Sequence, residues 1–243
     1  MVFNRKNIKN TIYFSFIVQI VTSFIASQGL FEEVNLEDEI LKDILTMELL
    51  VQFVESSFYI WVILALKDYN TLTQRRYIDW VITTPTMLLS TVIFMRYVEY
   101  KENNKKIPSF FEIINEEKEN LIKILIYNWL MLFFGFMGES GKLDKKLSVS
   151  VGFVFFYLSF NEIYSYAKQT EKGTNLFNFL LIVWSLYGFS ALLENNAKNI
   201  CYNLLDIVSK NFYGLYIYYI ITQVSPQKIG KNGLPDSTIS VSE

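Results

Sequence analysis

Long apolar segments separated by short polar ones make up most of this 243-residue chain. Each apolar segment has about 20 residues, the length at which an α-helix crosses the hydrocarbon core of a bilayer. The segments run near residues 8–30, 43–66, 77–98, 121–138, 147–168, 175–194 and 199–223. The pattern predicts an all-α fold, a bundle of seven transmembrane helices within residues 1–224. Residues 225–243 are rich in serine, glycine and proline, and we expect a disordered tail there.

The polar stretches alternate between the two ends of the predicted bundle. Residues 67–76, 138–146 and 194–198 connect helices at one end, and residues 31–43, 100–120 and 168–175 connect them at the other. Within 100–120, Pro108 and Ser109 suit a helix start. An apolar stripe of Phe110, Phe111, Ile113 and Ile114 follows, opposite Glu112, Glu116, Glu117 and Lys118. We expect a short interfacial helix on the membrane surface between helices 3 and 4, with an exposed polar linker as the alternative.

The first apolar segment follows basic residues, as in a secretory signal. Its length and its weak cleavage pattern favour a retained first span instead. Lysine and arginine residues are equally frequent at the two predicted ends, so the positive-inside rule does not give the orientation of the bundle.

Composition narrows the classes of function. The chain is 51% hydrophobic with a net charge of −2, so no basic surface is expected to recruit nucleic acid. It has one cysteine, Cys201, and no histidine, which removes internal disulfides, the usual zinc sets and histidine-based catalysis. We therefore expect a multi-pass integral membrane protein that is not an enzyme.

The last apolar segment contains a carboxylate and an amine near its middle. Asp206 and Lys210 are four residues apart, which places them on one face of a helix. Charges at membrane depth are costly unless they are paired, and each is a candidate functional residue. One interpretation is a structural ion pair inside a bundle. The other is a lysine that forms a Schiff base with an aldehyde, with the carboxylate as its counter-ion.

The third segment carries a second candidate group. Arg76, Asp79 and Thr83 lie three and four residues apart and share a helix face. A guanidinium and a hydroxyl beside a carboxylate would keep it ionised by charge and by hydrogen bonding. Pro85 follows and frees a backbone carbonyl, which threonine hydroxyls or water can satisfy.

These residues together resemble the microbial (type 1) rhodopsins across all seven segments. The resemblance is carried by Arg76, Tyr77, Asp79, Trp80, Thr83, Thr84 and Pro85, then by Trp184 and Tyr187, and then by Asp206 and Lys210. It implies all-trans retinal on Lys210 as a protonated Schiff base, with Asp79 and Asp206 as paired counter-ions and Arg76 below them. It further implies that Trp80 and Trp184 enclose the polyene, that Tyr187 bonds to Asp206, and that the N-terminus lies outside. Met87 occupies a colour-tuning position of some relatives and suggests green absorption.

The second segment carries acids that proton pumps of this family lack. Glu48, Gln52, Glu55 and Tyr59 form one polar stripe on an otherwise apolar helix. Ser15, Gln19 and Ser23 form a weaker stripe on the first segment, and Asn203 and Asn211 flank Lys210. Oxygen ligands and anionic sites facing a bundle interior are what a cation path needs. Solvation of Glu48 near a helix end, and a structural hydrogen bond for Glu55, are the alternatives.

Among these rhodopsins the chain is most similar to the group 1 viral rhodopsins of giant algal viruses. The matching positions are Ser15, Glu48, Glu55, Asn203 and Asn211. This resemblance implies a light-gated channel for monovalent cations that calcium inhibits, in a host-cell or viral membrane, and it leaves a homo-oligomer open.

Two departures from the proton pumps of the family bear on the alternatives. Gly188 stands where they have proline, and Ser90 where they usually have the carboxylate that returns the proton. A light-driven outward proton pump and a sensory rhodopsin are the alternatives to the channel.

Overall fold

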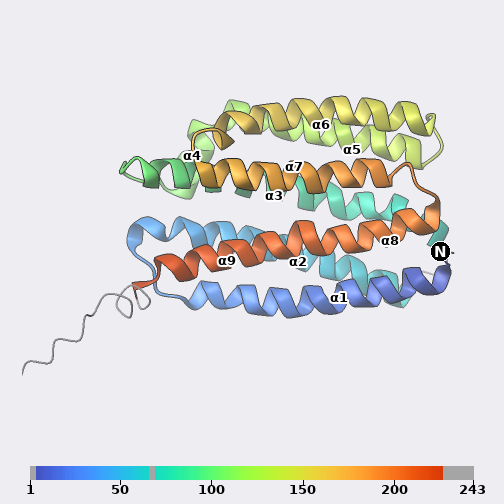
Figure 1. Ribbon diagram of the computed structural model, residues 1–243, viewed down its shortest axis with the longest axis horizontal. Coiled ribbons are helices and arrows are strands. Elements are labelled where there is room, and N and C mark those ends of the chain that lie inside the picture. The colour runs from blue at the N-terminus through green and yellow to red at the C-terminus, as the bar shows by residue number, and fades with distance from the viewer. Residues whose placement is uncertain (1–3, 66–68, 227–243) are drawn as a thin grey trace, which may run out of the picture.

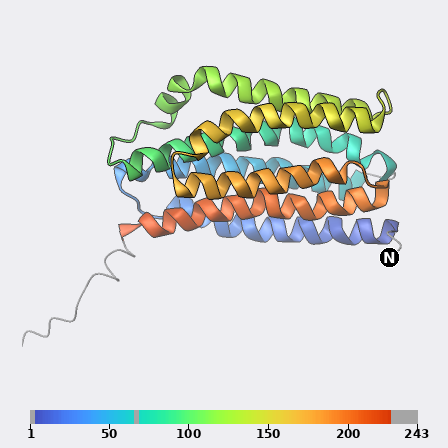
Figure 2. The same ribbon diagram turned by 45° about the horizontal axis from the view of Figure 1, so that its top comes forward.

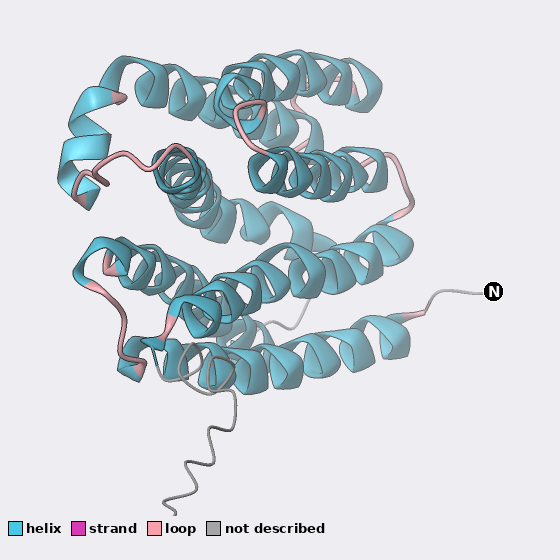
Figure 3. Ribbon diagram, turned by 60° about the vertical axis from the view of Figure 1, so that its left-hand side comes forward, coloured by secondary structure: helices cyan, strands magenta, loops and turns pink. Residues whose placement is uncertain are grey.

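The computed structural model describes residues 4–65 and 69–226, and within them it contains helices and connecting loops but no strand (Figures 1 and 3). The described helices form seven long rods. These rods run side by side along one axis (Figures 1 and 2). Six of them are single helices: α1 (Arg5–Ser27), α2 (Ile40–Ala65), α3 (Leu72–Glu102), α5 (Lys118–Glu139), α6 (Lys145–Ala167) and α7 (Glu171–Ser190). The seventh rod is continuous through α8 (Asn195–Asp206), a π-helical turn η4 (Ile207–Asn211) and α9 (Phe212–Val224). The predicted seven-helix bundle is confirmed.

Five of the described helical segments are long and apolar enough by themselves to cross a membrane, and they contain α1, α2, α3, α5 and α6. The two remaining rods belong to the same bundle, because α7 packs on α6 and α9 packs on α1 and α2. The side chains that face lipid are large and apolar, as at Phe24, Phe53 and Leu64. The protein is therefore a multi-pass integral membrane protein.

The loops connect the helices at the ends that the sequence predicts. At one end α5 turns into α6 through Gly141, whose φ of 71° is a conformation that glycine adopts without strain. Asp144 then caps α6 by accepting from the backbone N–H of Leu147 at 3.0 Å, and Thr170 caps α7 at the opposite end by accepting from Gly173. Short, capped turns of this kind leave adjacent helices antiparallel.

The predicted short helix exists as α4 (Phe110–Glu116), at the outer edge of one end of the bundle (Figure 3). Ser109 and Glu112 form a capping box, in which each side chain accepts from the other residue's backbone N–H. Its apolar stripe differs from the expectation, because Ile113 is buried against the bundle while Phe111 is 78% exposed. Most of this stripe is covered by the protein rather than by the membrane surface, since α4 folds back onto α3 and α5.

Pro85 lies inside α3 and removes the donor that would reach the carbonyl of Val81. The indole of Trp129 on α5 donates to that carbonyl at 3.4 Å. The sequence predicts that a threonine hydroxyl or a water satisfies this carbonyl. Thr84 does not do so, because its hydroxyl donates to the carbonyl of Trp80. Tertiary contact with α5 satisfies the break in α3.

One charged residue assigned to a loop lies inside the bundle. Lys198 in the first turn of α8 is buried, and its amine contacts both carboxylate oxygens of Glu139 at 2.6 Å. The predicted tail begins where α9 ends, and residues 227–243 lie outside the described residues. An outside N-terminus stays a prediction.

Candidate functional site

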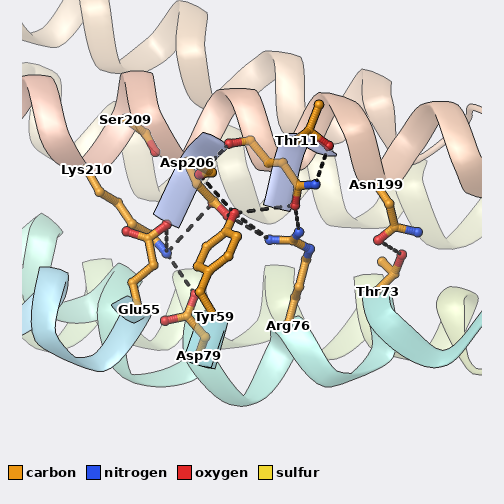
Figure 4. A network of polar contacts seen from close by, with 12 residues as sticks. Thr11, Glu55, Tyr59, Thr73, Arg76, Asp79, Asn199, Asp206, Ser209 and Lys210 are labelled. Atoms are coloured by element: carbon orange, nitrogen blue, oxygen red, sulfur yellow. Dashed lines mark hydrogen bonds and ion pairs between the residues drawn. The ribbon is translucent and has the colours of Figure 1, made fainter. Parts of the chain in front are cut away.

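Lys210 lies in the middle of the bundle with 2% of its surface exposed. Its Nζ donates to Oδ2 of Asp79 on α3 at 2.7 Å, and it lies 3.6 Å from Oε1 of Glu55 and 3.8 Å from Oδ1 of Asp206 (Figure 4). Three carboxylates from three helical rods thus surround one buried amine. Such a cluster is stable at membrane depth only because the opposite charges are in contact.

The backbone at Lys210 is a π-helical turn, η4, rather than a continuous α-helix. A π-helical turn holds more residues than an α-helical one, and such turns are frequent at functional sites. Here the turn contains both Ser209 and Lys210, and it directly follows Asp206. The hydroxyl of Ser209 lies 2.8 Å from the hydroxyl of Tyr187 on α7, so η4 contacts a second helix beside the lysine.

Asp206 is held by three donors. Arg76 pairs with its Oδ2 at 2.7 Å, and Tyr59 donates to the same oxygen at 2.8 Å (Figure 4). Tyr187 donates to its Oδ1 at 2.8 Å. The contact between Tyr187 and Asp206 is the one that the resemblance implied. Charge-assisted bonds from three helices fix this carboxylate as an anion.

Asp79 differs from the expectation. The hydroxyl of Thr83 donates to the backbone carbonyl of Asp79 at 3.0 Å, not to its carboxylate, and Arg76 pairs with Asp206. Helical side chains lean toward the helix N-terminus, so Arg76 leans away from a carboxylate three residues later. A threonine on a helix also reaches the carbonyl four residues before it. Lys210 is therefore the partner of the Asp79 carboxylate.

Glu55 was predicted as a residue of an ion path, and the structure places it at the lysine itself. Its Oε2 accepts a hydrogen bond from Nε2 of Gln19 on α1, while its Oε1 faces Lys210. The spacing of the stripe on α2 predicted that Glu55 faces inward. It did not reveal which charged residue of the seventh rod lies opposite, because that depends on how the rods pack.

Further polar residues, which include the predicted path residues Ser15 and Asn203, extend from Lys210 toward the end of the bundle where α1 begins. Arg76 donates to the side-chain oxygen of Asn203, whose own amide donates to Thr11 at 2.8 Å. Ser15 donates to the backbone carbonyl of Asn203 at 2.9 Å. Beyond them, Thr73 donates to Asn199 at 3.1 Å. All of these residues except Thr11 are buried.

A second set of polar groups continues in the opposite direction. The hydroxyl of Ser90 donates to Oε1 of Glu48, and both residues are fully buried. Thr22 on α1 donates to Asn211 at 2.7 Å. Glu48 is therefore inside the bundle rather than solvated. We call the whole series, from Thr73 and Asn199 to Glu48 and Ser90, the polar column; it lies between α1, α2, α3 and the seventh rod.

A cavity of about 120 Å³ lies on the other side of Lys210, toward α5, α6 and α7. Its lining is mostly apolar and aromatic, and it includes Trp80, Met87, Trp184, Tyr187 and Lys210. The sequence missed Asn128, a lone amide in the fourth apolar segment that donates to the hydroxyl of Thr84 at the cavity wall at 2.8 Å. Lys210 thus separates an apolar cavity from the polar column.

Comparison with known proteins assigns this arrangement. A family model described as bacteriorhodopsin-like protein matches residues 10–224. The chain belongs to this family. The rhodopsin is 24% identical over 169 residues to the green-light absorbing proteorhodopsin of Gamma-proteobacterium EBAC31A08, an alignment that spans 62% of this chain and 61% of that relative.

Solved structures show the same fold. Viral rhodopsin OLPVRII matches with a TM-score of 0.76 at 27% identity, over 89% of this chain and 98% of that one. The light-driven proton pump rhodopsin CsR of Coccomyxa subellipsoidea matches with a TM-score of 0.65 at 17% identity, over 90% and 98% of the two chains, which shows a shared fold alone. The prediction of a microbial rhodopsin most similar to viral rhodopsins is confirmed. Membership of group 1 stays a prediction.

Rhodopsins of this family bind retinal through a Schiff base to a lysine, and retinal is the cofactor. The site fits it on two counts. Lys210 provides an amine at the wall of the cavity, and the apolar, aromatic lining matches a polyene. The described residues contain no group of three or more acidic or cysteine side chains arranged to hold a metal ion, and inhibition by calcium stays a prediction.

Proposed function

We propose that this rhodopsin is a light-gated channel for monovalent cations, with retinal on Lys210. The observation that carries the proposal is the polar column. It passes Lys210 and extends in both directions from it, through Arg76 and Asn203 one way and toward Glu48 the other. A pump needs a proton relay, but a passive path needs oxygen ligands over the depth of the bundle.

The chemistry of the column suits cations. Its charged members near Lys210 are Glu55, Asp79 and Asp206, and these three carboxylates exceed the two cationic groups, Arg76 and Lys210. The remaining members supply hydroxyl and amide oxygens. Such oxygens replace part of the hydration shell of a monovalent ion, while the excess of carboxylates favours positive charge.

Lys210 is placed to link light to the column. When bound, retinal supplies the absorption of light and a change of shape. Asp79 is the group that can take a proton from the nitrogen of Lys210, across a contact of 2.7 Å. This proton transfer would neutralise both Asp79 and Lys210. Glu55 would then lose the positive charge opposite it, and the ion pair of Arg76 and Asp206 would lose a neighbouring one. The contacts that cross the column at Lys210 would then rearrange.

The deciding experiment records light-evoked current in voltage-clamped cells that express the protein with retinal, under two cation gradients. We expect a current that changes sign with the electrochemical gradient. A current that stays outward at every potential contradicts the channel. Lys210→Ala serves as the reference for the cofactor site and should give a colourless protein; a coloured variant would reject Lys210 as the retinal lysine.

A light-driven outward proton pump is the second candidate, and one contact favours it. Ser90 stands where pumps of the family usually have a carboxylate, but it donates to Oε1 of Glu48, so α2 brings a carboxyl group to that place. Glu48 would then return the proton toward Lys210. In the recording above, this candidate predicts the outward current at all potentials, and Glu48→Gln should slow the photocycle without changing the colour.

A further inference from the structure

Gln52 lies between the two glutamates of α2, four residues after Glu48 and three before Glu55. Its side chain is 1% exposed, and neither Nε2 nor Oε1 has a hydrogen-bond partner among the described residues. Burying an amide without partners is unfavourable relative to burying a hydrogen-bonded one. An apolar residue would avoid this cost, so a ligand for the amide is the physical reason to have one there.

The backbone of α9 makes room for this amide. A Cβ atom on Gly214 would clash with Nε2 of Gln52 and would lie 3.8 Å from Cβ of Glu48. Gly214 therefore lets α2 approach the seventh rod closely and leaves room for the amide of Gln52. Any side chain at position 214 would displace the flexible end of Gln52 before it displaced a backbone.

Other unpartnered polar atoms lie around the same place. Within the described part of the chain, Oε2 of Glu48 and the hydroxyls of Thr91 and Tyr213 form no hydrogen bond of normal geometry, although all three residues are buried. Tyr213 is an electrostatic neighbour of Glu48 and faces Thr91 and Ser90. Four residues from three helical rods, Gln52, Glu48, Thr91 and Tyr213, thus contribute such oxygen atoms to the column beyond the Lys210 cluster.

We propose that Gln52, Glu48 and Tyr213 form a transit site for a partly dehydrated monovalent cation, and that Gln52 determines which ions pass. This inference rests on the proposed channel function. Amide, carboxylate and phenol oxygens are hard ligands, and the site has a single acidic group. A divalent ion that is bound by protein ligands alone usually has several carboxylates, so one carboxylate with neutral oxygens suits a monovalent ion. Glu55 and Glu48 attract the ion at the two sides, and Gln52 receives it between them.

The test is Gln52→Leu, which keeps the shape and removes the oxygen ligand. Light-evoked currents are recorded once with sodium as the permeant ion and once with an impermeant organic cation, so that protons alone carry current. We expect the sodium current to fall about tenfold, the equivalent of losing one polar contact, while the proton current is retained. Gln223→Leu, the same change at an exposed position of α9, should leave both currents unchanged.

Gly214→Ala provides a second variant that removes no polar group. It displaces the amide of Gln52 and should lower the sodium current in the same direction. Both variants should keep the wild-type absorption band, which reports folding, because neither position lines the retinal cavity. Wild-type sodium currents and reversal potentials in both variants would overturn the role of Gln52 and leave the channel standing. A wild-type protein without a gradient-following current would overturn the channel and this site together.

Discussion

Lys210 and Asp79 form the closest ion pair within the buried charge cluster, with 2.7 Å between Nζ and Oδ2, whereas Oδ1 of Asp206 lies 3.8 Å from the same nitrogen. Asp206 is engaged by Arg76, Tyr59 and Tyr187. The two carboxylates are therefore unequal: Asp79 neutralises Lys210, and Asp206 neutralises Arg76. The sequence spacing predicts two equivalent acids, but in the structure they have different partners.

This inequality predicts different colours for two variants. Asp79 is the anion nearest the positive nitrogen, and it therefore stabilises the ground state of the bound chromophore most. Asp79→Asn removes this anion, so the absorption maximum of the variant should shift to longer wavelength by some tens of nanometres. Asp206→Asn should shift it less and should lower stability more, because it leaves the buried Arg76 unpaired. Absorption spectra and thermal loss of colour measure the two effects. An equal red shift in both variants would contradict the assignment of Asp79.

Glu55 contacts both the lysine and the polar column, so its removal should change two properties together. Glu55→Ala should lower the cation conductance and alter ion selectivity, and it should also shift the absorption maximum, because Oε1 lies 3.6 Å from Nζ of Lys210. Ser57→Ala is the matched control, since Ser57 is exposed on the same helix and donates only to the backbone of Phe53. If Glu55→Ala kept the conductance and selectivity, its role in the path would be rejected.

The helices and their inward faces were predictable because each depends on local pattern. The stripe of Glu48, Gln52, Glu55 and Tyr59 is entirely buried, as its spacing predicted. Pairings between helices were less predictable. The sequence could not show that Gln19 donates a hydrogen bond to Glu55, or that Ser90 donates one to Glu48. These contacts depend on the rotation and depth of each rod, which no single segment encodes.

Local rules fail where a contact is tertiary. Arg76 and Asp79 share a helix face, which predicts that they pair, but the lean of Arg76 along the helix brings it to Asp206. The polar segment around Lys198 predicts a loop, but Glu139 from α5 neutralises Lys198 inside the bundle. In both places the partner comes from another helix.

The ion pair of Lys198 and Glu139 yields a stability prediction. Lys198→Met leaves Glu139 nearly buried without its cation, and the free energy of unfolding should fall by about 3 kcal/mol, as for other broken buried pairs. Thermal loss of colour at lower temperature measures this change. The double variant Lys198→Met/Glu139→Gln should recover part of the loss, because no unpaired charge remains. A double variant less stable than Lys198→Met would show that the pair itself, not the leftover charge, sets the stability.

The capping box of α4 predicts a local dependence on pH. The backbone N–H and hydroxyl of Ser109 hold the pKa of Glu112 below its ordinary value. In a frayed α4 this contact is absent and the pKa returns to normal, so protonation favours the frayed form. The contribution of Glu112 is therefore fully present above the ordinary pKa of glutamate and is lost as the pH falls through the depressed value. Amide hydrogen exchange in residues 110–116, corrected for intrinsic rates, should lose protection in acid, and Glu112→Gln should flatten this dependence. An unchanged acid dependence in that variant would assign it to another group.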